Sequence, residues 1–362
     1  MPSKDFFRHL RTDFTQKVGA AIAKLEAWTE EELFYRRCYE LRHDKKSLAA
    51  FAENVDRGIL WGEQLPEFFQ RGENEFHLLE EMFLTAPDSK NRNVRLIKHC
   101  RYLPGFKHKH EFFEIVFVLK GQCTDTIEGK QMVLPAGTLC FIAPETYHTT
   151  EVLDDSIVLY LLVRHSTFDE VFVNLLSTSY PLSEFFLRSV YSKKPEYLVF
   201  NIADNTELLE QLLAMLVEQN IGDENSNRIM EAQLSIFLSL LNRSRGKSPM
   251  AHKQVGIKQQ HWEIIAYINK HFRTLTQAKL AAEFNFSIVH CSRIIKSITG
   301  KTFTGIVQEL RMNQARTMLL ASNVKIHNIS FSLGYENQES FIRSFKKTHG
   351  VSPVQYRKNN SG

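Results

Sequence analysis

The chain has 362 residues, of which 43% are hydrophobic and 24% are charged, and its formal net charge is +4. This length allows two or three domains with buried cores, while the lack of a long apolar run argues against a membrane span and the first residues do not resemble a secretory signal, so we expect a cytoplasmic protein. The five cysteines are odd in number and include no C-x-x-C pair, which argues against a disulfide framework and for reduced thiols.

Residues 1–88 are predicted to form a helical N-terminal extension. Residues 14–28 and 75–84 combine apolar and charged positions with residue types that favour helices. Neither segment contains a motif that indicates chemistry. We expect the extension to pack against the domain that follows it.

A change of pattern near residue 93 predicts a β-barrel over residues 89–170. Short segments rich in β-branched and aromatic residues alternate with Gly and Pro turns. These segments are residues 94–103, 112–119, 130–134, 138–142 and 157–163. Short strands at such regular spacing are typical of a small barrel.

The first of two motifs in this region is His108-x-His110-x3-Glu114-x6-Gly121. His108, His110 and Glu114 share one parity along an extended chain, so they face the same side of a strand. The second motif is Gly129-x5-Pro135-x-Gly137-x2-Cys140. Both resemble the two motifs of cupins, which implies a cupin-like barrel. In metal-binding cupins such side chains point into the barrel, and Cys140 stands at the fourth ligand position.

Three roles remain open for these side chains. Imidazole, carboxylate and thiolate groups suit Zn²⁺ or a related divalent metal ion. The same groups could instead line a pocket and bind a polar small molecule, or they could be purely structural. We favour the effector-binding pocket, formed by His108, His110, Glu114 and Cys140, without a required cofactor. His148 is a further candidate, at the mouth of the pocket.

Residues 171–245 are predicted to be helical. Leucine-rich stripes recur at helical spacing over residues 208–217 and 230–241. Such stripes usually form core, and the second is also our candidate surface for a homodimer. Residues 246–257 lose this periodicity and are predicted to be a linker.

The final third of the chain is strongly basic. Residues 257–362 contain 15 Lys and Arg against 5 Asp and Glu, whereas the rest of the chain contains 30 against 36. A basic module on a slightly acidic body is typical of binding to a phosphate backbone. We therefore expect double-stranded DNA as a partner of residues 258–358.

Two helix-turn-helix motifs are predicted within this module. In the second motif, Gly334 supplies a turn between a helix that starts near Ile326 and a helix that buries Phe341 and Phe345. Residues 277–298 repeat this pattern, with Asn285 at the turn. A long helix, residues 303–320, is expected to connect the two motifs.

The C-terminal motif closely resembles the signature of the AraC/XylS family of transcription regulators. The matching pattern runs from Ile326 through Gly334-Tyr335 and Phe341 to the Gly350-x-x-Pro353-x-x-Tyr356 ending. Cupin-like barrels are the effector domains of many such regulators. The resemblance implies an α+β multidomain protein: a cupin-like barrel followed by an all-α DNA-binding domain.

The helices that follow the two turns carry outward side chains suited to base edges. The predicted base-reading residues are Val289, His290, Ser292, Arg293, Asn337, Gln338, Glu339, Ile342 and Arg343. The predicted phosphate contacts are Lys301, Lys346, Lys347 and Arg357. Two rigidly joined motifs should read adjacent major grooves of an asymmetric site.

These features favour a sequence-specific transcription regulator that is not an enzyme. A small-molecule effector, such as a sugar or related metabolite, would bind in the barrel and change how two subunits place their motifs on DNA. RNA polymerase would be a partner of an activator. The alternatives are a metal-dependent cupin enzyme with accessory DNA binding and a non-specific architectural DNA binder.

Overall fold

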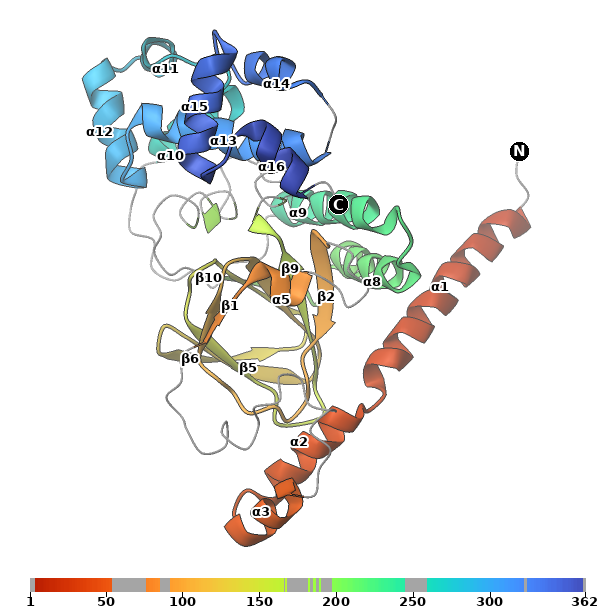
Figure 1. Cartoon of the computed structure of the whole chain (residues 1–362). Coiled ribbons are helices and arrows are strands. Elements are labelled where there is room, and N and C mark those ends of the chain that lie inside the picture. The colour runs from red at the N-terminus through yellow and green to blue at the C-terminus, as the bar shows by residue number, and fades with distance from the viewer. Residues whose placement is uncertain are drawn as a thin grey trace. The chain divides into compact units, whose positions relative to one another are not determined.

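The computed structural model describes residues 4–53, 76–84, 92–165, 167, 182, 185, 186, 189, 197–244, 259–321 and 324–360 (Figure 1). The chain forms two compact units, residues 1–171 with 194–253 and residues 172–193 with 254–362. The predicted linker, residues 246–257, lies outside the described residues. Among the helices of the described ranges, none has the length and apolar character needed to cross a membrane.

The described strands of the first unit form two five-stranded sheets. In order, one sheet contains β1 (Phe76–Leu78), β3 (His108–His110), β8 (His148–Glu151), β5 (Gln122–Ile127) and β6 (Lys130–Pro135). The other contains β10 (Tyr197–Asn201), β7 (Thr138–Ile142), β4 (Phe113–Lys120), β9 (Ile157–Val163) and β2 (Val94–Lys98). The β1–β3 pair is parallel, and the other described pairs are antiparallel. The predicted β-rich domain is therefore confirmed.

The five strand segments predicted from apolar patterns correspond to β2, β4, β6, β7 and β9. The strands that this pattern missed include the polar strands β5 and β8. In β5, Cys123, Asp125 and Ile127 are buried while the residues between them are partly or fully exposed. This alternation is the normal pattern of a strand with one covered face, but polar residues on both faces weaken its signal in the sequence.

The helix predicted over residues 75–84 is wrong in its first half. Phe76–Leu78 is strand β1, which pairs with His108–His110, and only Glu80–Leu84 is helical, as α5. Pairing with a distant strand overrides the local helix preference of this segment. Because β1 and β10 belong to the sheets, the sheet region extends beyond both ends of the predicted range 89–170.

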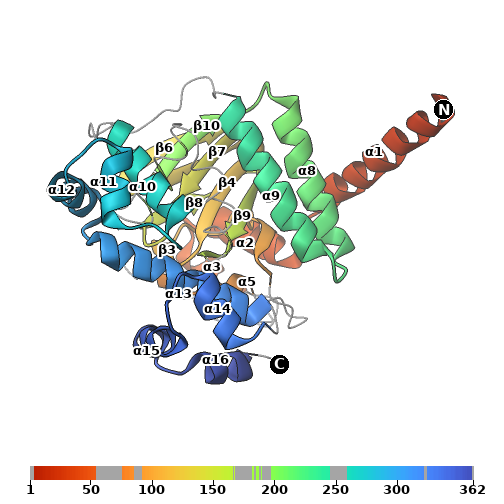
Figure 2. The same cartoon turned by 90° about the horizontal axis from the view of Figure 1, so that it is seen from above.

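Helices α8 (Thr206–Ile221) and α9 (Ser226–Arg243) pack against each other (Figure 2). Both helices also contact β2. The side chain of Asn205 caps the start of α8, and Gly222 ends it in a left-handed conformation, with φ of 63°. The stripe on α9 that we considered as a dimer surface is buried within the single chain: Phe237 and Leu238 are 0% exposed. This stripe is therefore core. The exposed apolar residues of α9 are Ile229 and Ile236.

The N-terminal extension contains α1 (Lys4–Glu26), α2 (Glu30–Leu41) and α3 (Lys45–Glu53). α1 packs against α8, and α2 packs on the sheet domain through Phe34, Tyr35 and Cys38, which form a cluster with Cys100 and other residues of the β2–β3 connection. The expected packing of the extension on the next domain is thus observed.

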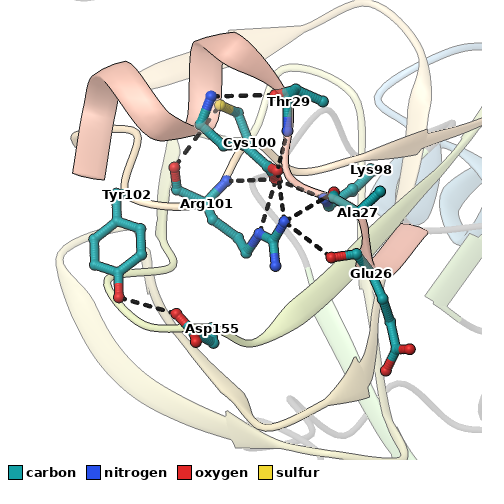
Figure 3. Close-up of polar contacts among 9 residues, drawn as sticks. Glu26, Ala27, Thr29, Lys98, Cys100, Arg101, Tyr102 and Asp155 are labelled. Atoms are coloured by element: carbon teal, nitrogen blue, oxygen red, sulfur yellow. Dashed lines mark hydrogen bonds and ion pairs between the residues drawn. The ribbon is translucent and has the colours of Figure 1, made fainter. Parts of the chain in front are cut away.

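A buried ionic cluster reinforces this contact (Figure 3). Arg101 donates hydrogen bonds to both carboxylate oxygens of Glu32, at 3.0 and 2.7 Å, and Lys98 Nζ lies 2.6 Å from Glu32 Oε1. The backbone N–H of Thr29 also donates to Glu32, and the Thr29 hydroxyl accepts from the Glu32 N–H, which forms a capping box at the start of α2.

The second unit is all-helical over the residues described. Its helices are α10 (Gln259–His271), α11 (Gln277–Glu283), α12 (Ile288–Thr299), α13 (Phe303–Ala321), α14 (Ile326–Ser332), α15 (Gln338–His349) and α16 (Pro353–Asn360). α13 contacts helices of both pairs, α12 as well as α14 and α15, as a connecting helix should. Pro353 begins α16, where its missing N–H is not needed.

Candidate functional site

The first helix-turn-helix consists of α11 and α12. Asn285 adopts the left-handed conformation predicted for the turn, with φ of 54°. Ser287 then caps α12 by accepting a hydrogen bond from the His290 N–H at 3.1 Å. α12 buries Cys291, Ile294, Ile295 and Ile298, which recur at helical spacing. The turn and the cap together fix which face of α12 is outward.

On that face Val289 is 60% exposed, and His290 and Arg293 are exposed as well. Ser292 is only partly exposed. Its hydroxyl donates a hydrogen bond to the Ile288 carbonyl oxygen and accepts one from the side-chain amide of Gln277 in α11. Of the predicted residues on this helix, three are available to a ligand and Ser292 helps to hold the two helices together.

The second helix-turn-helix repeats this construction with α14 and α15. Gly334 has φ of 81°, and a Cβ atom at this position would overlap the carbonyl oxygen of Arg273. Asn337 caps α15 by accepting from the Ser340 N–H at 2.8 Å. Phe341 and Phe345 are fully buried. Glycine is needed here both for the backbone conformation and for the close approach.

The outward face of α15 carries Glu339 and Arg343, which are exposed, and Gln338 and Ile342, which are partly exposed. Arg343 contacts Ser340 of its own helix at 3.5 Å. The side-chain carbonyl oxygen of Asn337 accepts the hydrogen bond of the cap. The side-chain amide nitrogen takes no part in the cap.

The four predicted phosphate contacts differ in their surroundings. Lys346 and Lys347 are exposed in the last turn of α15. Lys301 forms an ion pair with Glu309. Arg357 donates hydrogen bonds to the carbonyl oxygens of Leu319 and Val324 and so ties α16 to the end of α13. Arg357 therefore has a structural role, and its contact with phosphate stays a prediction.

The sheet domain contains a second candidate site, a cluster of buried polar side chains. His108 and His110 come from β3, Glu114 from β4 and His148 from β8, and all four are at most 7% exposed. His148 Nε2 lies 3.3 Å from Glu114 Oε1, and His110 Nε2 lies 3.8 Å from Glu114 Oε2. The ligand atoms of His108, Glu114 and His148 all lie within 4.8 Å of one another.

Burial controls the protonation of this cluster. It raises the pKa of Glu114 to about 7, although His108 opposes that shift. It lowers the pKa of His108 to about 3, helped by the neighbouring His148, and it lowers the pKa values of His110 and His148 as well. The histidines are therefore neutral at pH 7 and able to act as ligands through a ring nitrogen.

Cys140 does not complete this cluster as the second motif implied. Its side chain belongs to the apolar cluster that includes Val116, Val118 and Val199. Burial raises the pKa of its thiol far above the usual range, and Asp125 adds to that shift. The fourth residue is His148, which is a buried strand residue and not the predicted residue at a pocket mouth.

Sequence reasoning missed other polar groups of the same interior. Both carboxylate oxygens of Asp125 are buried without a hydrogen-bond partner among the described residues, and burial raises the pKa of this carboxyl to about 7. Tyr160 Oη lies 2.6 Å from His99 Nδ1, and burial raises the pKa of Tyr160 and lowers the pKa of His99 to about 4. A charged residue at an inward position of β5 was the available signal for Asp125.

Comparisons with known proteins agree with this two-part organisation. Residues 94–241 match the AraC-like ligand binding domain, and residues 280–359 match the helix-turn-helix domain family. The HTH-type transcriptional activator RhaS of Klebsiella pneumoniae is 24% identical over 257 residues, which cover 69% of this chain and 87% of that protein. RhaS of Mannheimia succiniciproducens is 23% identical over 252 residues, 69% of this chain and 88% of that protein.

Two solved structures illustrate the structural similarities that were found. The C-terminal domain of AraT, a response regulator from Geobacillus stearothermophilus, is 38% identical and covers 28% of this chain and 86% of that chain, with a TM-score of 0.28. ToxT from Vibrio cholerae with bound unsaturated fatty acid is 17% identical and covers 73% of this chain and 94% of that chain, with a TM-score of 0.30. From its two matched domains and its relatives, the chain belongs to the AraC/XylS family of transcription regulators.

Proposed function

We propose that this AraC-type regulator recognises its DNA site through the outward faces of α12 and α15. The observation that carries the proposal is the duplicated construction: each helix follows a left-handed turn, begins with a side-chain cap and leaves an exposed arginine, Arg293 or Arg343. Arginine can bond to both acceptors of a guanine in the major groove. Lys346 and Lys347 supply charge for the phosphate backbone.

The test is a gel-shift titration on a site selected from random duplexes. Arg343→Ala and Arg293→Ala should each cost roughly 1–3 kcal/mol and relax the preference at particular base pairs, whereas Lys347→Ala should weaken all sequences alike and reduce the salt dependence. Arg37→Ala, at an exposed arginine of α2, is the matched control. If the two arginine variants weaken every sequence equally, direct base reading by these residues is wrong.

We also propose that the effector is a small polar molecule, such as a sugar, bound inside the sheet domain. The support is a set of buried polar side chains inside the sheet domain. Asp125, Glu114 and the histidines contribute hydrogen-bonding atoms there, and several of these atoms have no hydrogen-bond partner among the described residues. Buried polar groups without partners favour a ligand with hydroxyl groups over a plain hydrocarbon chain.

A thermal-shift screen of sugars and fatty acids would test this class of effector, because a ligand that binds only the folded state raises the unfolding temperature. We expect at least one polyhydroxylated compound to raise it, and the same compound to change the affinity for DNA by linkage. A rise with fatty acids alone would contradict a polar effector.

The remaining features of the regulator are proposals of the same kind. We expect a cytoplasmic homodimer without enzymatic activity, which contacts RNA polymerase if it activates transcription. Since the apolar stripe of α9 is core, a dimer would have to use another surface, such as the exposed face with Ile229 and Ile236. Sedimentation of the chain and of Ile236→Lys would test this: the variant should shift the equilibrium toward monomer.

A further inference from the structure

The turn of the second helix-turn-helix lies directly against a segment that supports the first. Gly334 occupies this turn, and a Cβ atom at its position would overlap the carbonyl oxygen of Arg273 and lie 2.9 Å from Nη2 of Arg311. Arg273 follows the end of α10, and α10 contacts both α11 and α12. The two motifs therefore meet directly, in addition to their connection through α13.

Arg311 of α13 bonds to both sides of this contact. Its Nη2 donates a hydrogen bond to the Arg273 carbonyl oxygen at 2.9 Å. Its guanidinium also lies over the ring of Tyr335, with Cζ 5.2 Å from the ring centroid, which is a cation–π distance. The Tyr335 hydroxyl in turn donates to Gln308 of α13 at 3.0 Å. We call Arg273, Arg311, Gly334 and Tyr335 the inter-motif junction.

The junction restricts a motion that the chain connections allow. α12 ends at Gly300 with φ of 68°, and a glycine at such a connection adopts a wide range of backbone conformations. Arg311 is partly buried, and a hydrogen bond from a charged donor is stronger than one between neutral groups. A charged bond between segments far apart in the chain therefore resists rotation of one motif against the other.

We propose that Arg311 is a positioning residue, which fixes α12 relative to α15 and so sets the one spacing of half-sites that the chain accepts. The inference rests on the proposed reading of DNA by these two helices and adds selectivity for spacing to it. Reading helices in successive major grooves lie about one turn of DNA apart, and one inserted base pair rotates the half-sites by about 35°. A rigid pair of helices cannot follow that rotation.

The test measures the affinity of the full chain for three duplexes by gel shift. The first is a site selected from random duplexes and divided into half-sites by footprinting, the second has one base pair inserted between the half-sites, and the third has one half-site scrambled. The wild-type chain should bind the lengthened duplex at least ~10-fold more weakly than the selected one, because one reading helix is displaced from its base pairs. We call the ratio of these two affinities the spacing selectivity.

Arg311→Met keeps a long side chain but removes the charge and the donor. It should lower the spacing selectivity at least ~3-fold, because the motifs can then adjust to the longer site, and it should leave the affinity for the scrambled duplex within about 2-fold. Arg311→Lys keeps a charge and a donor and should retain a spacing selectivity close to that of the wild type. Arg316→Met removes one charge from the same helix and should keep the wild-type ratio, since a uniform loss of attraction to phosphate cancels in it.

The outcomes separate failure of this inference from failure of the proposed function. If scrambling either half-site leaves the wild-type affinity unchanged, the chain does not read two grooves, and both proposals are wrong. If both half-sites matter but Arg311→Met, shown to be folded by circular dichroism, has the wild-type spacing selectivity, only the role of Arg311 is wrong. One measurement needs no variant: equal wild-type affinity for the selected and the lengthened duplex would show that the helices are not held at one spacing.

Discussion

The first unit contains two buried carboxylates with opposite surroundings. Glu32 is 1% exposed and receives charged donors from Arg101 and Lys98 together with the Thr29 N–H (Figure 3). Glu114 is 4% exposed and faces imidazole nitrogens that cannot donate to it, and its Oε1 has no hydrogen-bond partner among the described residues. One carboxylate is completely satisfied by the protein and the other is not.

This difference separates a structural site from a binding site. A buried ion pair with all its hydrogen bonds made holds two elements in one arrangement, here α2 and the β2–β3 connection. A buried polar group that the protein leaves without a partner lowers stability, and such groups in folded proteins require an explanation. The bound polar effector that we propose is the explanation that we infer for Glu114 and Asp125.

The largest change in the free energy of unfolding should come from breaking the buried ion pair of Arg101 and Glu32. Arg101→Ala leaves the Glu32 charge buried with fewer donors, and loss of one partner of a buried ion pair costs about 3–5 kcal/mol. Urea unfolding followed by circular dichroism should show this loss in the transition of the sheet domain. Arg37→Ala removes an exposed ion pair with Glu40 and should change stability by roughly 0–1 kcal/mol. Equal effects of the two variants would show that the pair does not hold the extension.

A smaller change of opposite sign, a gain in stability, is expected when Asp125 is replaced. Burial raises its pKa to about 7, whereas the unfolded carboxyl ionises near 3.8. The unfolded state therefore releases its proton first, and stability falls as the pH rises from about 4 to about 7. Asp125→Asn should remove this loss and stabilise the chain at pH 8 by on the order of 2–4 kcal/mol.

Unfolding of the Asp125→Asn and wild-type chains should be compared at pH 4, 6 and 8 with a chelator present, because a bound cation would offset the buried charge. The gain should grow across this range and level off above pH 7. A destabilised variant at pH 8 would mean that the Asp125 carboxylate is satisfied by the protein after all.

The smallest effect is expected from acid on the Glu32 pair. Burial alone would raise the pKa of Glu32, but the hydrogen bonds from Arg101 and Lys98 outweigh it and hold the pKa below its ordinary value of 4.5. The contribution of the pair is thus complete above pH 4.5 and is lost as the pH falls through the lower folded pKa. The stability difference between wild type and Glu32→Gln should shrink below pH 4.5. A difference that is constant from pH 6 to pH 3 would contradict this assignment.

Local patterns were sufficient for the DNA-binding unit. The turn residues Asn285 and Gly334 and the burial of Phe341 and Phe345 follow from interactions within a few residues, so their spacing in the sequence was enough to predict them. The predicted common interior of His108, His110 and Glu114 is also observed, but the histidines lie on β3 and Glu114 on β4 of the other sheet, so parity along one strand is not the reason that they meet.

Contacts between distant segments were not predictable in this way. His148 enters the cluster because β8 pairs with β3, which places it opposite His108, and no local pattern specifies that register. The same is true of β1, whose pairing with β3 overrode a local helix preference, and of Glu32 and Arg101, which lie 69 residues apart in the chain.

The amino-acid sequence by itself therefore determined the family, the two helix-turn-helix motifs and the residue types available to the interior of the sheets. Only the tertiary structure decided that His148 joins the histidine cluster in place of Cys140, that the α9 stripe is core and that Arg101 anchors the extension. The physical reason is that periodicity reports which face of an element is buried, whereas strand register and helix docking decide which buried groups meet.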